Sequence, residues 1–67
     1  MRLSARNQFD GVITEVRLGT VMAEVHVDIG GHTIVSAITR ESAEGLALAK
    51  GDRVTAIIKS TEVLVGK

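Results

Sequence analysis

Small aliphatic side chains occupy every second position from Val21 to Ile29, and this alternation constrains the fold more than any other part of the chain. A period of two is typical of a strand with one buried face. Gly30-Gly31 follows directly and supplies the positive backbone angles that a two-residue hairpin turn requires. We therefore expect a further strand to return from His32 to about Ile38.

A longer extended segment precedes this hairpin, from Gln8 to Leu18. An uninterrupted strand divides its side chains by odd and even position, here Val12, Thr14, Val16 and Leu18 on one face and Phe9, Gly11, Ile13, Glu15 and Arg17 on the other. Gly11 is notable because a glycine inside a strand marks a bulge, a bend or a close backbone approach. Gly19-Thr20 predicts a tight turn, so the first three strands should form an antiparallel meander.

The pattern changes at Thr39, where a helix-capping residue is followed by acidic residues and helix formers. A helix of about two turns fits this segment. Leu46 and Leu48 cannot lie on one helical stripe, so the helix should end near Leu46 and before Lys50-Gly51.

Two more strands are predicted after the helix. Lys50-Gly51-Asp52 predicts a turn into a strand from Arg53 to Lys59. Ser60-Thr61 interrupts that strand, and Glu62 to Val65 is predicted to be a last, short one. The sequence thus predicts an all-β fold with one short helix, built as a five-stranded barrel like the OB fold.

The chain is 67 residues long and is expected to be a single domain spanning residues 1–67. A domain of this size buries only about 60% of the surface of its unfolded chain, so it needs a further source of stability. The sequence has no cysteine, and its two histidines, His26 and His32, are too few for structural zinc and are expected at the surface or an interface. A homo-oligomer that buries the remaining aliphatic surface is therefore expected.

Eight basic and eight acidic residues are mixed along the chain, so the formal net charge is zero. Bulk charge therefore favours neither nucleic acid nor a membrane surface as a partner, and the one aromatic residue, Phe9, cannot provide a base-stacking platform. No long apolar segment is present, so we expect no signal peptide, no membrane span and a cytoplasmic location. No residue spacing indicates catalysis, a metal site or an organic cofactor, and we do not expect an enzyme.

Three short segments combine hydroxyl groups with a cation or with a predicted helix start: Ser4 and Arg6, Thr39 and Ser42, and Lys59 with Ser60. Such groups, with the backbone amides of the helix start, could surround a small anion. Each pair also has a simpler interpretation. Ser4 and Asn7 could only shape a turn beside a solvated Arg6, and Thr39 with Ser42 could only cap the helix. Lys59 with Ser60 could be a solvated strand end. From these residues alone both interpretations stay open.

A cage built from all six residues would present only hydrogen-bond donors to the anion, with each hydroxyl group pointing its hydrogen toward it. A fully ionised tetrahedral oxyanion accepts many hydrogen bonds and donates none, whereas hydrogen phosphate carries a proton that needs an acceptor. The predicted cage therefore discriminates against hydrogen phosphate, and its size would separate a large oxyanion from sulfate. Because a buried dianion is very costly unless its oxygens are paired, nearly every oxygen would need a donor.

Over nearly its whole length the chain resembles the Mop family of small molybdate-binding proteins, the molbindins. The matching stretches follow the family's order: Ser4-Ala5-Arg6-Asn7, Gly11-Val12-Ile13, Gly19, Ala23-Glu24-Val25, Gly30-Gly31, Ile38-Thr39, Ser42-Ala43, Gly51-Asp52 and Ile58-Lys59. The resemblance implies an OB-like fold, a hexamer described as a trimer of dimers, and molybdate or tungstate bound between subunits. It also implies that one subunit contributes Ser4 and Arg6, and that its partner or a close neighbour contributes Thr39, Ser42, Lys59 and Ser60.

Three positions depart from the family pattern. Ser60 stands at a position where, by resemblance to the family pattern, many relatives carry alanine. Its backbone N–H, rather than its hydroxyl group, is therefore an alternative contact for the anion. Met22 stands where relatives often carry a polar residue, and Phe9 where leucine is common.

The same module is similar to domains of molybdate-responsive transcription regulators and of molybdate-transporter ATPases. Here no helix-turn-helix and no nucleotide-binding loop accompany it. The resemblance therefore implies intracellular storage or homeostasis of molybdate. The alternative function is a structural domain that oligomerises through its aliphatic surface without binding an anion specifically.

Overall fold

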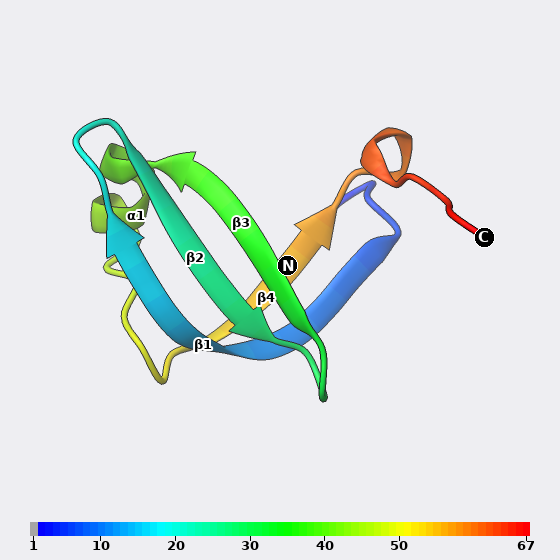
Figure 1. Cartoon of the computed structure of the whole chain (residues 1–67), viewed down its shortest axis with the longest axis horizontal. Helices are drawn as coiled ribbons and strands as arrows, with labels where there is room; N and C mark the ends of the chain where they lie inside the picture. Colours follow the sequence, from blue (N-terminus) through cyan, green and yellow to red (C-terminus); the bar gives the residue numbers. More distant parts are fainter. Residues whose placement is uncertain (1) are drawn as a thin grey trace.

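The computed structural model describes residues 2–67 and contains one antiparallel sheet of four strands. These strands are β1 (Asn7–Leu18), β2 (Met22–Asp28), β3 (Thr33–Thr39) and β4 (Arg53–Ile58), in the sheet order β3-β2-β1-β4. The α-helix α1 (Arg40–Gly45) connects β3 to β4, and a 3-10 helix, η1 (Ser60–Glu62), follows β4. Figure 1 shows a strongly curled sheet with α1 at one end and η1 at the other.

The meander predicted from alternation is confirmed, because β2 pairs antiparallel with both β1 and β3. Gly30 and Gly31 both have positive φ angles, 96° and 92°, and the Ile29 N–H donates to the His32 carbonyl at 2.9 Å to close the turn. The Asp28 carboxylate accepts from both glycine N–H groups. This turn fixes the register that turns Val25 and Val27 into the core.

The sequence predicted an uninterrupted strand from Gln8 to Leu18, and the faces that it assigned to the side chains after Ile13 are wrong. The register of β1 against β2 shifts between Ile13 and Glu15, which is the signature of a β-bulge. Beyond the bulge the parity is reversed, so Val16 joins Ile13 at the core and Glu15 lies beside His26 on the outer face. An odd-and-even reading of the sequence cannot detect the extra residue.

Gly11 lies where two strands approach each other closely. A Cβ atom at this position would lie 2.5 Å from the Asp28 carbonyl oxygen and 2.7 Å from a methyl carbon of Val27. The sequence predicted a bulge, a bend or a close approach at this glycine, and the structure shows that it is a close approach. The absence of a side chain lets β1 curl against β2.

The predicted helix is confirmed in place and in length. Thr39 is the N-cap, α1 ends at Gly45, and Leu46 is the C-cap. Ala43 faces inward and is 2% exposed, which anchors the helix against the end of the sheet. Within residues 2–67 no helix has the length and apolar character needed to cross a membrane.

The predicted fifth strand, Glu62 to Val65, is wrong for this chain. Glu62 is the last residue of η1, and the residues after it form no strand within the described part of the chain. Leu64 and Val65 are each 93% exposed, and Figure 1 shows this C-terminal segment leading away from the sheet. The turn at η1 redirects the chain before it can pair with β3 or β4.

The result is a curled half-barrel with an OB-like arrangement of four strands. Few large side chains are buried inside it: the buried hydrophobic residues are Ile13, Ala23, Val25, Val27 and Ala43. Large exposed aliphatic residues remain at both ends, including Leu18, Val21 and Leu46 near α1. An exposed apolar surface of this kind is typical of a chain that associates with others.

Replacing Gly11 by alanine should destabilise the fold by about 1–3 kcal/mol, because the new methyl group would collide with backbone that cannot move freely. Gly45 is the matched control, since an added Cβ meets nothing within 4 Å there. Urea denaturation followed by circular dichroism measures both variants. Equal stabilities of Gly11→Ala and Gly45→Ala would contradict the close approach.

Candidate functional site

Four of the six predicted site residues lie at the same end of the chain. Asn7 pairs with Ile58 across β1 and β4, so the segment just before β1 lies beside the segment just after β4. The first segment carries Ser4 and Arg6, and the second carries Lys59 and Ser60. We call these four residues the N-terminal cluster, and all four are exposed.

The other two predicted residues, Thr39 and Ser42, form the helix-start cluster at the opposite end of the sheet. Thr39 pairs with Met22 at the start of β2, beside the C-terminal end of β1. The N-terminal cluster lies beyond the other end of β1, which is 12 residues long. A single chain therefore does not bring the two clusters together (Figure 1).

Within one chain this grouping differs from the one that the resemblance implied. The resemblance implies that Lys59 and Ser60 belong to the same subunit contribution as Thr39 and Ser42, and that Ser4 and Arg6 come from the other subunit. The β1–β4 pairing instead places Lys59 and Ser60 beside the N-terminal segment of their own chain. A site made of all six residues needs at least two copies of the chain.

The helix-start cluster is held by two hydrogen bonds of its own. The Thr39 hydroxyl donates to the Ser42 Oγ at 2.8 Å, and the Ser42 N–H donates to the Thr39 Oγ1 at 3.1 Å. The Arg40 N–H donates to the Val21 carbonyl at 2.8 Å. Two N–H groups of the helix start thus have acceptors in the chain, and the Ser42 hydroxyl keeps its own hydrogen for a further acceptor.

The N-terminal cluster contains a contact that the sequence did not predict. The Asn7 Nδ2 donates to the Ser60 Oγ at 3.4 Å, joining the start of β1 to the residue that begins η1. Next to it, the Gln8 Nε2 donates to the Ala5 carbonyl at 2.6 Å and holds the segment between Ser4 and Arg6 against the strand. Only knowledge of the β1–β4 register could have revealed the first contact.

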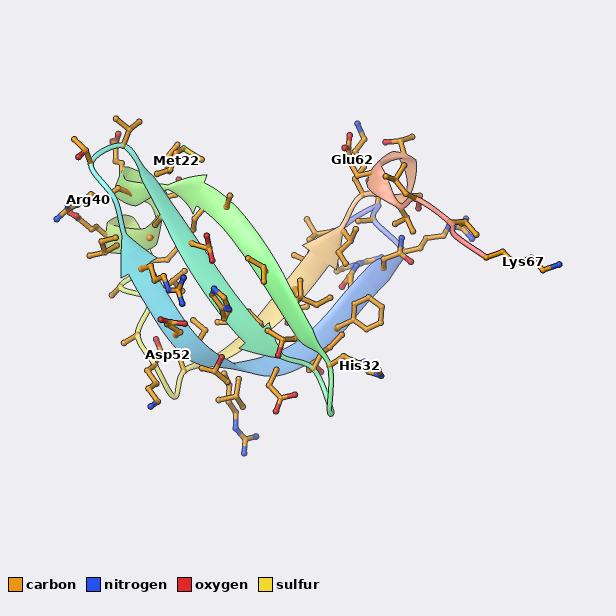
Figure 2. All side chains as sticks on the ribbon, in the orientation of Figure 1. Met22, His32, Arg40, Asp52, Glu62 and Lys67 are labelled. Carbon is orange, nitrogen blue, oxygen red and sulfur yellow. The ribbon has the colours of Figure 1, made fainter. Side chains whose placement is uncertain are left out.

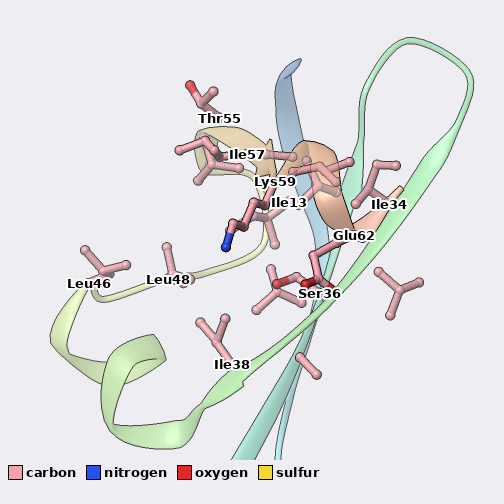
Figure 3. Close-up of a pocket in the computed structure, with 17 residues that line it drawn as sticks. Ile13, Ile34, Ser36, Ile38, Leu46, Leu48, Thr55, Ile57, Lys59 and Glu62 are labelled. Atoms are coloured by element: carbon pink, nitrogen blue, oxygen red, sulfur yellow. The ribbon is translucent and has the colours of Figure 1, made fainter. Parts of the chain in front are cut away.

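Lys59 also lines an apolar groove of about 720 Å³ between β3 and β4. Figure 3 shows its side chain reaching into the groove, with Glu62 nearby and Ile38 and Leu48 below it. The sides of the groove are the two outermost strands of the sheet, which curl toward each other without pairing within residues 2–67. The barrel is therefore open along this side.

The outer face of β1 and β2 carries an ionic cluster away from both predicted clusters. The Arg17 Nε donates to Glu15 Oε1 at 2.7 Å, and the His26 Nε2 lies 2.6 Å from Glu24 Oε1. The hydrogen bond from Arg17 lowers the pKa of Glu15 below its ordinary value. Figure 2 shows the side chains on the ribbon. Across residues 2–67, histidines and carboxylates form no group of three that could hold a metal ion.

Comparison with known proteins identifies the family. The model described as "TOBE domain" matches residues 3–65, which is nearly the whole chain. The chain belongs to the TOBE domain family.

Individual relatives agree with this assignment. This TOBE chain is 44% identical to molybdenum-pterin-binding protein 3 of Clostridium pasteurianum over 97% of both chains. It is 43% identical to a molybdate-binding protein from Sporomusa ovata, covers that structure completely and superposes with a TM-score of 0.94. A molybdate-bound structure of the cytoplasmic molybdate-binding protein ModG is 41% identical, with a TM-score of 0.86 over 90% of this chain and 43% of that one. These relatives are described as binding proteins rather than enzymes.

Replacing Thr39 by alanine should cost about 1 kcal/mol of folding free energy, because the cap of α1 loses its acceptor for the Ser42 N–H. Thr39→Ser keeps the hydroxyl and is the matched control, with nearly wild-type stability expected. Thermal and urea denaturation of the anion-free protein measure both. A Thr39→Ala variant as stable as Thr39→Ser would show that the cap contributes nothing.

Proposed function

We propose that this protein binds molybdate or tungstate at sites shared between the subunits of a homo-oligomer, for storage or homeostasis of the anion in the cytoplasm. The observation that carries the proposal is the close match, over the full chain, to a solved molybdate-binding protein. The ligand is the oxyanion itself, with no organic cofactor and no nucleic-acid or membrane partner. We infer no catalytic step and treat residues 1–67 as one binding domain.

The chemistry of the two clusters supports this ligand. Arg6 and Lys59 offer cationic donors, while Ser4, Ser42, Ser60 and Thr39 are hydroxyl residues. Charge-assisted bonds from guanidinium and ammonium groups to an oxyanion are about twice as strong as neutral ones. The six side chains include no carboxylate, so such a site would favour an oxyanion that carries no proton.

The placement of the clusters supports a site between subunits. Because they lie at opposite ends of the sheet, the N-terminal cluster of one copy can meet the helix-start cluster of another. An isologous pair would form two such contacts, and a closed ring would form one contact for each interface. Either arrangement gives one shared site for each chain.

The open groove and the C-terminal segment support assembly. The groove is lined mainly by aliphatic side chains of β3, β4 and the α1–β4 loop. Val63, Leu64 and Val65 are exposed directly after η1, and the backbone of Val63 is extended. The segment is apolar and short enough to lie in the groove of a second copy, where both neighbouring strand edges are available. We propose that such contacts build the dimers of a hexamer organised as a trimer of dimers.

Calorimetric titration of the anion-free protein should show strong binding of molybdate and tungstate, and much weaker binding of sulfate and phosphate. Equal or absent heats for all four anions would instead favour the alternative function, a structural oligomerisation domain.

Arg6→Ala should weaken molybdate binding by about 1.5–3 kcal/mol per site, since a charge-assisted bond is lost. Arg2→Ala removes a charge from the same segment and is the matched control, with a much smaller effect expected.

Mixed oligomers test whether the site is shared. Arg6→Ala impairs the N-terminal cluster and Ser42→Ala impairs the helix-start cluster. When the two variants are unfolded together and refolded at equal amounts, random pairing should restore about a quarter of the sites to wild-type affinity, because each subunit supplies the half that the other lacks. A mixture that binds no more tightly than the separate variants would contradict a shared site.

Native mass spectrometry tests the assembly. The wild type should be a hexamer at micromolar concentration, whereas the double variant Leu64→Asp/Val65→Asp should give smaller species because charges would enter the apolar groove. Lys67→Asp changes the charge of the same segment beyond its apolar part and should leave the hexamer intact. A monomeric wild type would contradict the proposed assembly.

A further inference from the structure

Asn7 occupies the position from which a side chain can control Ser60. It is the first residue of β1, it is half-buried, and its register partner, Ile58, lies two residues before Ser60. Its Nδ2 donates to the Ser60 Oγ at 3.4 Å. The contact joins the two segments that carry the N-terminal cluster.

A hydroxyl group has one hydrogen and two lone pairs, so the partner of its oxygen influences where its hydrogen points. Where Asn7 donates to Ser60, one lone pair of the serine oxygen is engaged and the serine hydrogen remains available to another acceptor. Ser42 shows the same arrangement, since the Thr39 hydroxyl donates to its oxygen at 2.8 Å. In both clusters a neighbouring side chain thus acts as donor toward the serine oxygen.

We infer that Asn7 is a positioning and specificity-determining residue for the oxyanion. It orients the Ser60 hydroxyl so that this group donates a hydrogen bond to the ligand, while Asn7 itself touches Ser60 and not the anion. The inference rests on the proposed function and deepens it, because it assigns part of the discrimination between unprotonated and protonated oxyanions to a residue outside the six proposed ligands.

The sequence offered other roles for these residues, and they give different expectations. If Asn7 only shapes the backbone before β1, its loss would weaken the fold and the site without regard to Ser60. If Ser60 contributes only its backbone N–H, loss of its hydroxyl would leave molybdate affinity unchanged. An effect of Asn7 that depends on the Ser60 hydroxyl separates the inference from both alternatives.

A double-mutant cycle on the full-length protein measures that dependence. Asn7→Ala should weaken molybdate binding about three- to tenfold in the wild-type background, which corresponds to one hydrogen bond. In the Ser60→Ala background the same substitution should change the affinity less than about twofold, because its partner is already gone. Denaturation of the anion-free variants reports any change in folding separately.

Thr55→Val is the matched control for the loss of a side-chain contact between β1 and β4. The Thr55 hydroxyl donates to the Asp10 carboxylate at 3.0 Å in the same strand pair, away from the N-terminal cluster. This variant should keep wild-type molybdate affinity. A loss equal to that of Asn7→Ala would show that any weakening of the β1–β4 pair affects the site, and would overturn the positioning role.

Asn7→Asp tests the direction of the hydroxyl. An aspartate can only accept, so the Ser60 hydrogen would turn toward residue 7 and the serine would present a lone pair to the anion. At mildly alkaline pH, molybdate and hydrogen phosphate are both dianions, so the added charge weakens the two similarly. The ratio of molybdate to phosphate affinity should therefore fall about tenfold, because phosphate can donate its proton to the serine oxygen.

Three outcomes distinguish this inference from the proposed function. Coupling between Asn7 and Ser60, together with a reduced affinity ratio in Asn7→Asp, supports both. Tight molybdate binding by the wild type with additive Asn7 and Ser60 effects, or with an unchanged ratio, overturns the inference alone. A wild-type protein that does not bind molybdate overturns the proposed function, and the inference falls with it.

Discussion

The close contact of β1 with β2 at Gly11 is the constraint on which the rest of the structure depends. β1 pairs with β4 through its first half and with β2 through its second half, and Val12 has a partner on both sides. The strand can serve both partners only if it curls sharply, and the missing side chain at Gly11 permits that approach. The bulge that follows returns Val16 to the core beside Ile13. The curl brings β3 and β4 to face each other across the groove.

This geometry links stability, assembly and the proposed site. A half-barrel with a small aliphatic core leaves a groove and an exposed apolar segment around Leu64, and association is an economical way to bury both. The same long β1 separates the N-terminal cluster from Thr39 and Ser42. If the anion binds between copies, binding and assembly stabilise each other, because the ligand then favours the associated state.

Much of the fold followed from local chemistry. The valine alternation before Gly30-Gly31 specifies a hairpin because each glycine accepts a positive φ, and Thr39 begins a helix because its hydroxyl satisfies the Ser42 N–H. The bulge after Ile13 escaped prediction because it adds one residue without any change in composition. The fifth strand failed because apolar residues such as Leu64 indicate a need for burial but not which chain provides it.

For the candidate site, too, some properties follow from the sequence alone and others only from the tertiary structure. The sequence by itself determined the residue types, namely hydroxyl groups together with Arg6 and Lys59, and hence the class of ligand that such donors suit. Only the tertiary structure decided which of them are neighbours, because strand register is a long-range property. The β1–β4 register placed Asn7 against Ser60, 53 positions away in the chain, and left Thr39 and Ser42 at the far end. Short-range patterns specify turns, caps and chemistry, whereas distance in space depends on how the whole sheet curls.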